Sequence, residues 1–375
     1  MVFGWLYGKT FSTDDIPNLD GKVALITGGT AGLGMASAIA MAQKGAHVTI
    51  TARSESRGKE AVQKIMEASN SSKVEFGVMD NGDLLSVRTF AEWYKQKSLP
   101  IHILLLNAGI AYTPYNSISG IEGQFYINHL SHFYLTELLL PIIKKSGPAR
   151  IVTVSSRGID LVWSKPDWEQ DAHVPKEKYD NVRAYGLSKL ANLLFVKELT
   201  KRLGPDSQIY ANSCHPGVIA TNITNRSWYA GGYAEKVILF GIGTVMGNTP
   251  DKGALTQLYL ATSEEVETQN IRGKYFWPTA KEKPMTGYAA DEILQTDIWD
   301  VRPVRAVRRM DVRALAPSLA HTLEMIRFYW RKVIKAGEGV EGTRFTVDAH
   351  LVGASRDKME QEQIVSAVSM QPPPL

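Results

Sequence analysis

The sequence has little cysteine, little net charge and no long apolar run. Its single cysteine, Cys214, cannot close a disulfide within the chain or form a multi-cysteine zinc site, which fits a reducing compartment. Lys and Arg number 42 against 38 Asp and Glu, a formal charge of +4 that is too small and too dispersed for a nucleic-acid groove. We therefore expect no nucleic-acid partner.

No stretch approaches the roughly 20 apolar residues that span a bilayer, so we expect no integral membrane segment. The apolar run 237–243 is predicted to be a buried helix segment; a mobile lid against a membrane or an apolar substrate is the alternative. The first 15 residues lack the regions of a secretory signal. A cytoplasmic location is expected, with peripheral membrane association left open.

Short β-branched runs alternate with longer helical patterns, which is typical of βαβ units on a parallel sheet. A helix is expected over Ala36–Lys44, after a glycine turn. The expected strands are Val23–Thr27, His47–Thr51, Val74–Met79, Ile101–Leu106, Arg150–Ser155, Gln208–Cys214 and Lys274–Trp277. The fold class predicted is α/β, with a single doubly wound Rossmann-type sheet flanked by helices.

The pattern divides the chain into three parts. Residues 1–20 are expected to be an N-terminal arm and residues 21–300 the α/β domain. Residues 301–375 form an arginine-rich extension of unknown role, with a possible helix at His321–Lys335. A poorly ordered extension is the preferred interpretation; an interaction or oligomerisation segment, or a stretch that selection never shaped, are the alternatives.

The motif TGGTAGLG at 27–34 lies between a predicted strand and a predicted helix, the context that indicates dinucleotide binding. Gly28 would permit the tight turn, Gly32 the close approach of backbone to pyrophosphate, and Gly34 the helix–sheet contact. Leu33 lies within the same motif and is counted with the cofactor-binding residues. A simple turn is the alternative.

The end of the second strand discriminates between cofactors. It carries Arg53 where an acidic residue would bind the adenosine ribose, and a guanidinium can clamp a 2′-phosphate, so NADP(H) is favoured over NAD(H). An exposed arginine without a partner is the alternative.

Asp80 ends the third strand and either binds the adenine amino group or caps the next turn. Asn107 ends the fourth strand. It is expected either to lie beside the nicotinamide ribose or to tie neighbouring strands together.

Ser155 and Ser156 lie at the end of a predicted strand, so at least one hydroxyl is expected in the crevice at the carboxyl ends of the strands. It would hold a substrate carbonyl, as an oxyanion donor does. A nucleophilic serine is disfavoured, because no G-x-S-x-G elbow surrounds the pair.

Tyr185 and Lys189 stand four residues apart in a predicted amphipathic helix and therefore on one face of it. A nearby ammonium would favour the phenolate and lower the pKa of the tyrosine, making it a proton donor and acceptor near neutral pH. Together with the glycine motif, the pair points to hydride transfer.

Asn128 lies in another helix-like stretch, with His129 and His132. Their i, i+3 spacing has no convincing acidic third partner, so packed or surface histidines are favoured and no metal is expected.

Taken jointly, these motifs resemble those of the short-chain dehydrogenase/reductase superfamily, whose glycine motif is T-G-x-x-x-G-x-G. The segments NHLSHFYLTELLLPIIKKSGPARIVTVSSRG and YGLSKLANLLFVKELTKRLG are similar to the subgroup of retinol dehydrogenases, WW-domain oxidoreductases and protochlorophyllide reductases. The likeness covers about residues 21–300.

The resemblance implies a catalytic tetrad of Asn128, Ser156, Tyr185 and Lys189. Tyr185 would be the acid/base and is counted, with Lys189, among the cofactor-binding residues. Lys189 would bind the nicotinamide ribose and lower the pKa of Tyr185. Ser156 would hold the reacting oxygen, and Asn128 would anchor a water.

The family's P-G motif appears at 215–218, which implies that Val218 and Thr221 meet the nicotinamide amide and the phosphates. The insert Arg157–Ala184 carries Trp163 and Trp168, which line the substrate cleft or pack the insert down; packing is favoured.

Two features depart from the subgroup: its membrane-anchoring N-terminal segment has no counterpart, and neither does the extension after Asp300. The expected function is NADP(H)-dependent hydride transfer to or from a ketone or secondary alcohol of an apolar substrate, with a role in secondary-metabolite biosynthesis as a further prediction. The alternatives are a C=C reductase of the same family and a non-catalytic NADP(H)-binding sensor or scaffold. A homo-oligomer is expected from the family.

Overall fold

The computed structural model describes residues 11–217 and 249–301. These residues lie in the first of two compact units, Met1–Met310, and the second unit, Asp311–Leu375, lies outside them. The run 237–243, Val218, Thr221 and the possible helix His321–Lys335 also lie outside the described residues.

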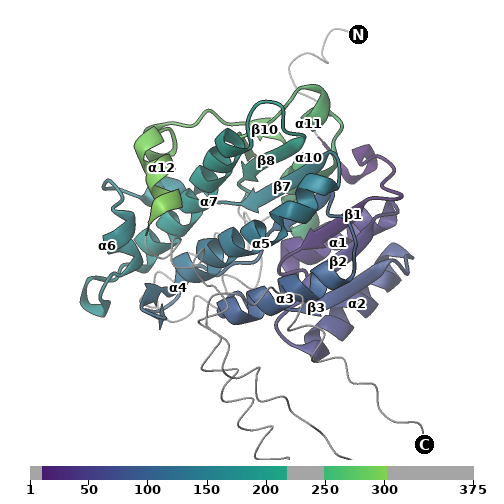
Figure 1. Cartoon of the computed structure of the whole chain (residues 1–375), viewed down its shortest axis with the longest axis horizontal. Helices are drawn as coiled ribbons and strands as arrows, with labels where there is room; N and C mark the ends of the chain where they lie inside the picture. The colour runs from purple at the N-terminus through teal and green to yellow at the C-terminus, as the bar shows by residue number, and fades with distance from the viewer. Residues whose placement is uncertain (1–10, 218–248, 302–375) are drawn as a thin grey trace, which may run out of the picture. The chain divides into compact units, whose positions relative to one another are not determined.

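An eight-stranded sheet forms the centre of the described residues (Figure 1). Its order is β10-β9-β8-β7-β4-β1-β2-β3, and every pairing is parallel except that of β10 with β9. The strands are β1 Val23–Ile26, β2 His47–Ala52, β3 Val74–Val78, β4 Ile103–Leu106, β7 Ala149–Val154, β8 Ile209–Cys214, β9 Tyr275–Trp277 and β10 Lys281–Glu282. A separate two-stranded ladder joins β5 Ser117–Ile118 to β6 Ile121–Glu122.

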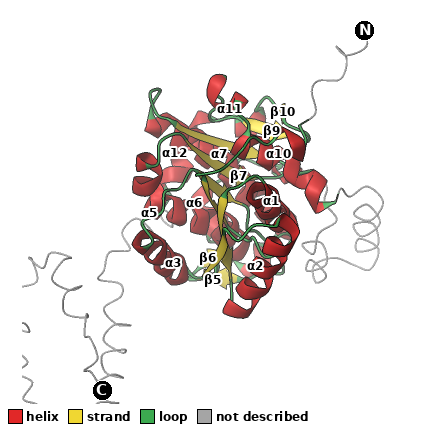
Figure 2. Ribbon diagram, turned by 90° about the vertical axis from the view of Figure 1, so that its right-hand side faces the viewer, coloured by secondary structure: helices red, strands yellow, loops and turns green. Residues whose placement is uncertain are grey.

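Helices cover both faces of the sheet, which is seen nearly edge-on in Figure 2. On one face lie α1 Gly32–Gln43, α2 Glu55–Ser69 and α10 Pro250–Thr262, and on the other α3 Leu84–Gln96, α5 Ser131–Lys145, α7 Asn181–Leu203 and α12 Glu292–Asp300. The shorter helices are α4 Gly123–Phe125, α6 Trp168–Ala172 and α11 Glu265–Thr268. Each layer encloses its own apolar cluster against the sheet.

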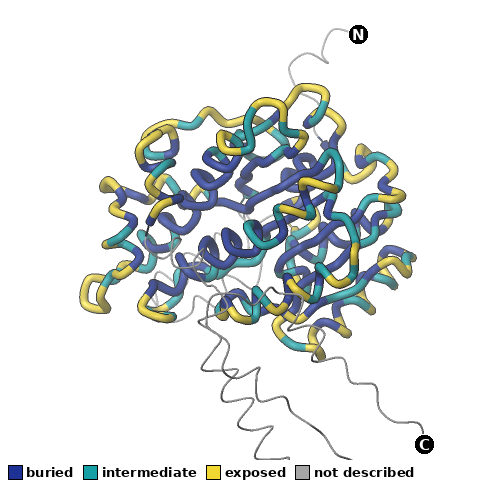
Figure 3. Tube along the Cα trace, in the orientation of Figure 1, coloured by how far each residue is buried: buried dark blue, intermediate teal, exposed yellow. Residues whose placement is uncertain are grey.

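The central strands are buried along their whole length, which is why their sequences are apolar runs without alternation. Every residue of β1, β4 and β7 is buried, because helices cover both faces of a parallel sheet (Figure 3). The predicted α/β doubly wound fold is confirmed.

The observed elements agree with the expected ones within one or two residues, with two informative differences. The fourth strand begins at Ile103, because the Ile101 N–H donates to the Ser146 hydroxyl (2.8 Å) and so leaves the ladder. The first helix begins at Gly32 and not at Ala36, because it starts inside the glycine motif itself.

The sheet order places the candidate site. Chain connections reverse direction between β1 and β4, so the carboxyl ends of these neighbouring strands open a crevice where doubly wound folds bind ligands. The glycine motif follows β1, Asn107 follows β4 and the Ser155–Ser156 pair follows β7. Residues predicted independently therefore meet at one edge.

The described part of the N-terminal arm is packed into the domain. Phe11, Ile16 and Leu19 are buried in the cluster beneath α1 and α10, and the Phe11 ring meets Tyr259 edge-on at 5.5 Å. Within residues 11–217 and 249–301, none of the helices combines the length and the apolar character needed to cross a membrane.

Candidate active site

Tyr185 lies in the first turns of α7, which Asp180 caps by accepting from the Val182 and Arg183 amides (2.9 and 2.8 Å). Its phenol interacts with the side chain of Ser156, the second residue after β7. The strand end and the helix start thus bring two hydroxyls together, where one substrate oxygen can meet both.

The structure decides which serine of the pair faces the tyrosine. The Ser155 side chain is buried and donates to the Lys189 carbonyl (2.7 Å), so it fastens β7 to α7. The Ser156 hydroxyl accepts from the Gly158 amide (3.0 Å) and, being a hydroxyl, still has its own hydrogen to donate. Ser156 is therefore the one beside Tyr185.

Gly158 is a site residue that sequence reasoning missed. A Cβ built on it would lie 2.8 Å from Tyr185 Cε1, closer than side chains tolerate. The glycine makes room for the tyrosine ring beside the strand end. The signal was present in the sequence, as the glycine two residues after the Ser-Ser pair.

The Lys189 ammonium is buried on the same side of α7 as Tyr185. It donates to the Val154 carbonyl (3.0 Å) and lies 5.8 Å from the centroid of the Tyr185 ring. Burial lowers the pKa of Lys189 to about 8. The predicted i, i+4 pairing on one face is observed, with the ammonium over the ring and bonded to the strand end.

The expectation that Lys189 lowers the pKa of Tyr185 differs from what the structure shows. Burial raises the pKa of Tyr185 above its usual range, the Ser156 hydrogen bond opposes this, and the neighbouring Tyr112 phenol adds to it. The physical reason is that desolvation of the phenolate outweighs the charge of the Lys189 ammonium, which lies 5.8 Å from the ring centroid and donates one hydrogen bond to the Val154 carbonyl. In this state Tyr185 holds its proton.

Asn128 lies in a π-helical turn, Tyr126–Leu130, between α4 and α5. Its amide oxygen accepts from the Ile110 N–H (2.8 Å), and its amide nitrogen donates to the Ile110 carbonyl (2.9 Å) and the Ser188 hydroxyl (3.0 Å). The side chain thus clamps the loop after β4 to the tyrosine helix. π-turns of this kind are frequent at functional sites.

The glycine motif forms a tight turn and a close contact with the start of α1. Gly28 and Gly32 have φ of +67° and +55°, the left-handed region that favours glycine. A Cβ at Gly34 would lie 2.4 Å from the Gly28 carbonyl oxygen, so α1 packs against the turn only with glycine there. Leu33 is partly buried against the α1 side of the core, and its carbonyl accepts from Gln257 (3.4 Å).

Arg53 follows β2 at the same edge of the sheet and is exposed. Within residues 11–217 and 249–301 its guanidinium has no hydrogen-bond or ion-pair partner. Asp80 has a structural role, since its Oδ1 accepts from the Gly82 amide (2.8 Å) and caps the turn after β3. The arrangement leaves Arg53 available for an anion.

Asn107 ties strands together, which was one of its two expected roles. Its amide nitrogen donates to the carbonyl oxygens of Thr27 (2.9 Å) and Gly28 (3.4 Å). It therefore holds the glycine turn against the end of β4, and any contact with a cofactor would be additional.

Tyr112 is a second aromatic residue at the site that the sequence did not reveal. Its ring centroid lies 4.7 Å from that of Tyr185, and its φ of +53° is uncommon for a residue other than glycine. The Gln124 side chain accepts from its N–H (2.8 Å) and the Asn181 side chain donates to its carbonyl (3.3 Å). A left-handed tyrosine has no signature in the sequence.

His129 and His132 are buried in the helix, as the packing interpretation predicted. In the described ranges, no group of three or more His, Cys, Asp or Glu could hold a metal ion.

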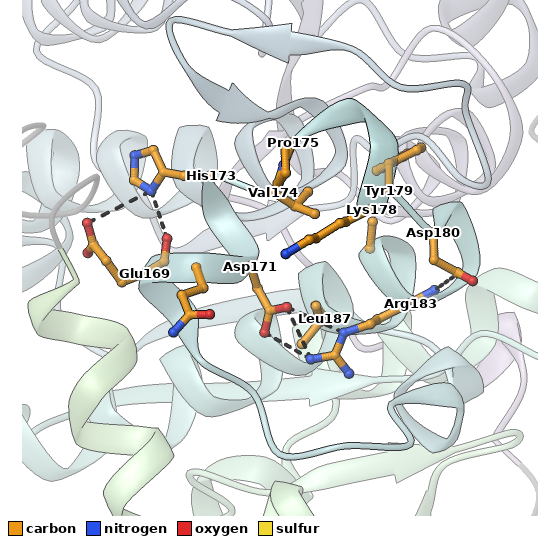
Figure 4. A pocket seen from close by; sticks show the side chains of 12 residues that line it. Glu169, Asp171, His173, Val174, Pro175, Lys178, Tyr179, Asp180, Arg183 and Leu187 are labelled. Atoms are coloured by element: carbon orange, nitrogen blue, oxygen red, sulfur yellow. Dashed lines mark hydrogen bonds and ion pairs between the residues drawn. The ribbon is translucent and has the colours of Figure 1, made fainter.

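The insert before α7 forms a separate cavity of about 590 Å³ (Figure 4). Arg183 and Leu187 line it; each is two residues from Tyr185, about 200° around the helix, so the cavity lies on the other side of α7. The Asp171–Arg183 ion pair (3.0 Å) forms part of its wall. Trp168 is buried and packs the insert, whereas Trp163 is 62% exposed.

Comparison with known proteins agrees with this site. The family model described as short chain dehydrogenase matches residues 22–161. The chain is 36% identical to the WW domain-containing oxidoreductase of Gallus gallus over 289 residues, 76% of this chain and 68% of that protein. It is 34% identical to retinol dehydrogenase 14 of Homo sapiens over 300 residues, 76% of this chain and 86% of that protein.

Among solved structures, an uncharacterized protein from Mycobacterium paratuberculosis superposes with a TM-score of 0.61 at 28% identity, covering 80% of this chain and 97% of that one. The chain belongs to the short-chain dehydrogenase/reductase family, and the predicted subgroup is confirmed. Members of this family are oxidoreductases that use nicotinamide cofactors.

Proposed function

We propose that this protein is an NADP(H)-dependent reductase or dehydrogenase that acts on a ketone or secondary alcohol of an apolar substrate. The observation that carries the proposal is the placement of the Ser156 hydroxyl beside the Tyr185 phenol at the carboxyl end of β7, with the buried ammonium of Lys189 on the same side of α7. The pair offers two hydroxyl donors to one oxygen atom.

The residues present fit a dinucleotide. Gly28 and Gly32 adopt left-handed conformations, and Gly34 leaves no room for a side chain, so backbone approaches the crevice closely. The start of α1 would bind the pyrophosphate, and Arg53 a 2′-phosphate. When bound, the nicotinamide supplies or accepts the hydride. Val218 and Thr221 would complete the site, as the family implies.

Tyr185 is the proposed proton donor in reduction. Because burial raises its pKa, the phenol stays protonated at physiological pH and can protonate the carbonyl oxygen that becomes the alcohol. Ser156 would polarise the same oxygen. Lys189, with its pKa lowered to about 8, would bind the ribose as a cation and return protons to Tyr185. Asn128 would hold the loop and helix in register.

An apolar substrate is supported by the name of one relative, since retinol is an apolar alcohol. Exposed apolar side chains also lie in the insert after Ser156, at Leu161 and Trp163. The predicted cytoplasmic location, homo-oligomer, domain limits and role in secondary metabolism stay predictions.

The test is a panel of apolar ketones screened for NADPH oxidation, with Tyr185→Phe as the inactive control. Turnover that Tyr185→Phe abolishes would support the proposal, and turnover that Tyr185→Phe retains would overturn it. With deuterated NADPH, label on the carbon that bears the new hydroxyl indicates carbonyl reduction. Label on a carbon of the former C=C bond indicates the C=C reductase. Tight NADPH binding without turnover on any substrate would favour the sensor or scaffold.

A further inference from the structure

A buried chain of hydrogen bonds runs from the glycine turn through His132 to Asn128 in the π-helical turn. The imidazole Nε2 lies 2.9 Å from the Thr27 hydroxyl, and Nδ1 lies 3.0 Å from the Asn128 carbonyl oxygen. Thr27 opens the glycine motif and Asn128 belongs to the tetrad. No more than 2% of His132 and none of Thr27 and Asn128 is exposed, so water does not substitute for these bonds.

The partners fix the direction of each bond. A carbonyl oxygen only accepts, so Nδ1 must carry hydrogen and donate to Asn128. In the neutral ring Nε2 then has a lone pair, and the Thr27 hydroxyl must donate to it. The Thr27 oxygen is left to accept, and it takes the amides of Asn107 (2.9 Å) and Ala108 (3.0 Å).

His132 is neutral in this arrangement. Burial, together with the charge of Lys189, lowers the pKa of His132 to about 3, and protonation would remove the acceptor that Thr27 requires. The imidazole thus donates at Nδ1 and accepts at Nε2, and the Thr27 hydroxyl donates to the imidazole and accepts two amides. Fully satisfied buried networks of this kind hold a single arrangement of the groups they connect.

We propose that His132 is a positioning residue that couples the dinucleotide-binding turn to the catalytic Asn128 segment. Its Nε2 end holds Thr27, and through Thr27 the loop at Asn107 and Ala108. Its Nδ1 end holds the π-turn, whose Asn128 side chain clamps Ile110 and Ser188. The proposal rests on the proposed function, because it assumes that the glycine turn binds a dinucleotide.

Two substitutions separate the two ends of the imidazole. His132→Asn keeps a donor near the position of Nδ1 and loses the acceptor for Thr27. His132→Gln keeps an acceptor near the position of Nε2 and loses the donor to Asn128. A buried group left without its partner shifts an equilibrium by about tenfold. We expect His132→Asn to raise the Kd for NADPH about tenfold, and His132→Gln to leave the Kd within about twofold and lower kcat about tenfold.

His129 provides the matched control. It is equally buried, lies in the same π-turn and contacts Asn192 (3.3 Å), and it has no bond to the glycine turn among the described residues. His129→Asn and His129→Gln are expected to lower Tm and leave the Kd for NADPH and kcat within about twofold.

The Kd is measured by fluorescence titration of the full chain with NADPH and with NADH, alongside Tm. Thr27→Val breaks the same bond from its other end and also removes the acceptor of the Asn107 and Ala108 amides. In the Thr27→Val background, His132→Asn is therefore expected to cause no further rise in Kd. The Thr27→Val variant also keeps the proposal testable if the His132 variants do not fold.

The outcomes separate the two proposals. A wild-type chain that binds neither dinucleotide would overturn the proposed function and the coupling with it. A wild-type chain that binds, with Kd and kcat of the His132 variants changed no more than those of the His129 variants, would overturn the coupling alone. Additive effects of Thr27→Val and His132→Asn on Kd would also contradict it.

Discussion

The Ser155 hydroxyl donates to the main-chain carbonyl of Lys189 at 2.7 Å, so the two adjacent serines have different roles. Ser155 is expected to contribute to stability and Ser156 to turnover. Ser155→Ala should lower the free energy of unfolding by about 1 kcal/mol and keep most of kcat, because one buried hydrogen bond is lost. Ser156→Ala should lower kcat about 100-fold. It also loses the part-buried bond from the Gly158 amide, so we expect it to lower the free energy of unfolding by no more than Ser155→Ala does.

Urea denaturation and steady-state kinetics on both variants check this assignment. If Ser155→Ala lost turnover and Ser156→Ala kept it, the roles would be reversed.

Tyr185→Phe should lower kcat by 100-fold or more, because positioned acid–base groups contribute about 10²–10⁴-fold. Its Kd for NADPH should stay within about twofold, since the glycine turn and Arg53 are untouched. Single-turnover kinetics with a confirmed substrate, together with a binding titration, measure both quantities. A tenfold loss of dinucleotide affinity would show that the phenol has a binding role instead.

Gly158→Ala should disturb Tyr185 without removing any functional group. The added methyl would lie 2.8 Å from the tyrosine ring and push it from Ser156. Misplacement by about 1 Å can lower a rate about 100-fold, so we expect kcat to fall between 10-fold and 100-fold. Gly82→Ala is the control, because its methyl would meet a carboxylate oxygen of Asp80 at 3.2 Å, far from Tyr185.

Lys189→Met should stabilise the protein while abolishing activity. The pKa of Lys189 falls from 10.5 to about 8 on folding, so burial of the ammonium destabilises the fold wherever the amine is charged in both states, below pH 8. Between pH 8 and 10.5 this destabilisation fades, because the folded state releases its proton first. After subtraction of the lost hydrogen bond to Val154, we expect the free energy of unfolding of Lys189→Met at pH 7 to exceed that of wild type by about 2 kcal/mol.

Denaturant unfolding of both proteins at pH 7 and pH 10 measures this difference. A gap between variant and wild type that does not shrink at the higher pH would contradict the depressed pKa.

Arg53→Ala should raise the Kd for NADPH by 10-fold to 100-fold and leave that for NADH unchanged, since a charge-assisted bond to phosphate contributes about 1.5–3 kcal/mol. Arg57 is the matched control, an exposed arginine within α2, and Arg57→Ala should leave both affinities unchanged. Equal loss for both dinucleotides in Arg53→Ala would argue against 2′-phosphate recognition.

The strands could be predicted because their physics is local. A parallel strand that is covered on both faces is apolar throughout. The runs Val23–Ile26 and Ile103–Leu106 meet this condition and could therefore be recognised as buried strands. The glycine turn was predictable for a similar reason, since Gly28 and Gly32 mark backbone conformations that other residues avoid.

The electrostatics of the site could not be predicted in the same way. The spacing of Tyr185 and Lys189 places them on one face, but the pKa of the phenol depends on its desolvation and on where the ammonium directs its proton. These depend on Val154 and Tyr112, which lie far away in the sequence. The π-turn around Asn128 and the left-handed Tyr112 likewise follow from tertiary contacts.

The single cysteine can report how often the central sheet opens. Cys214 is fully buried at the end of β8, hydrogen-bonded through its backbone to the strand that carries the serines, and burial raises the pKa of its thiol to about 12. Because only the exposed thiolate reacts with alkylating agents, the labelling rate of wild-type protein reports how often the centre of the sheet separates. A ligand bound at the neighbouring strand ends should slow this labelling in proportion to its saturation.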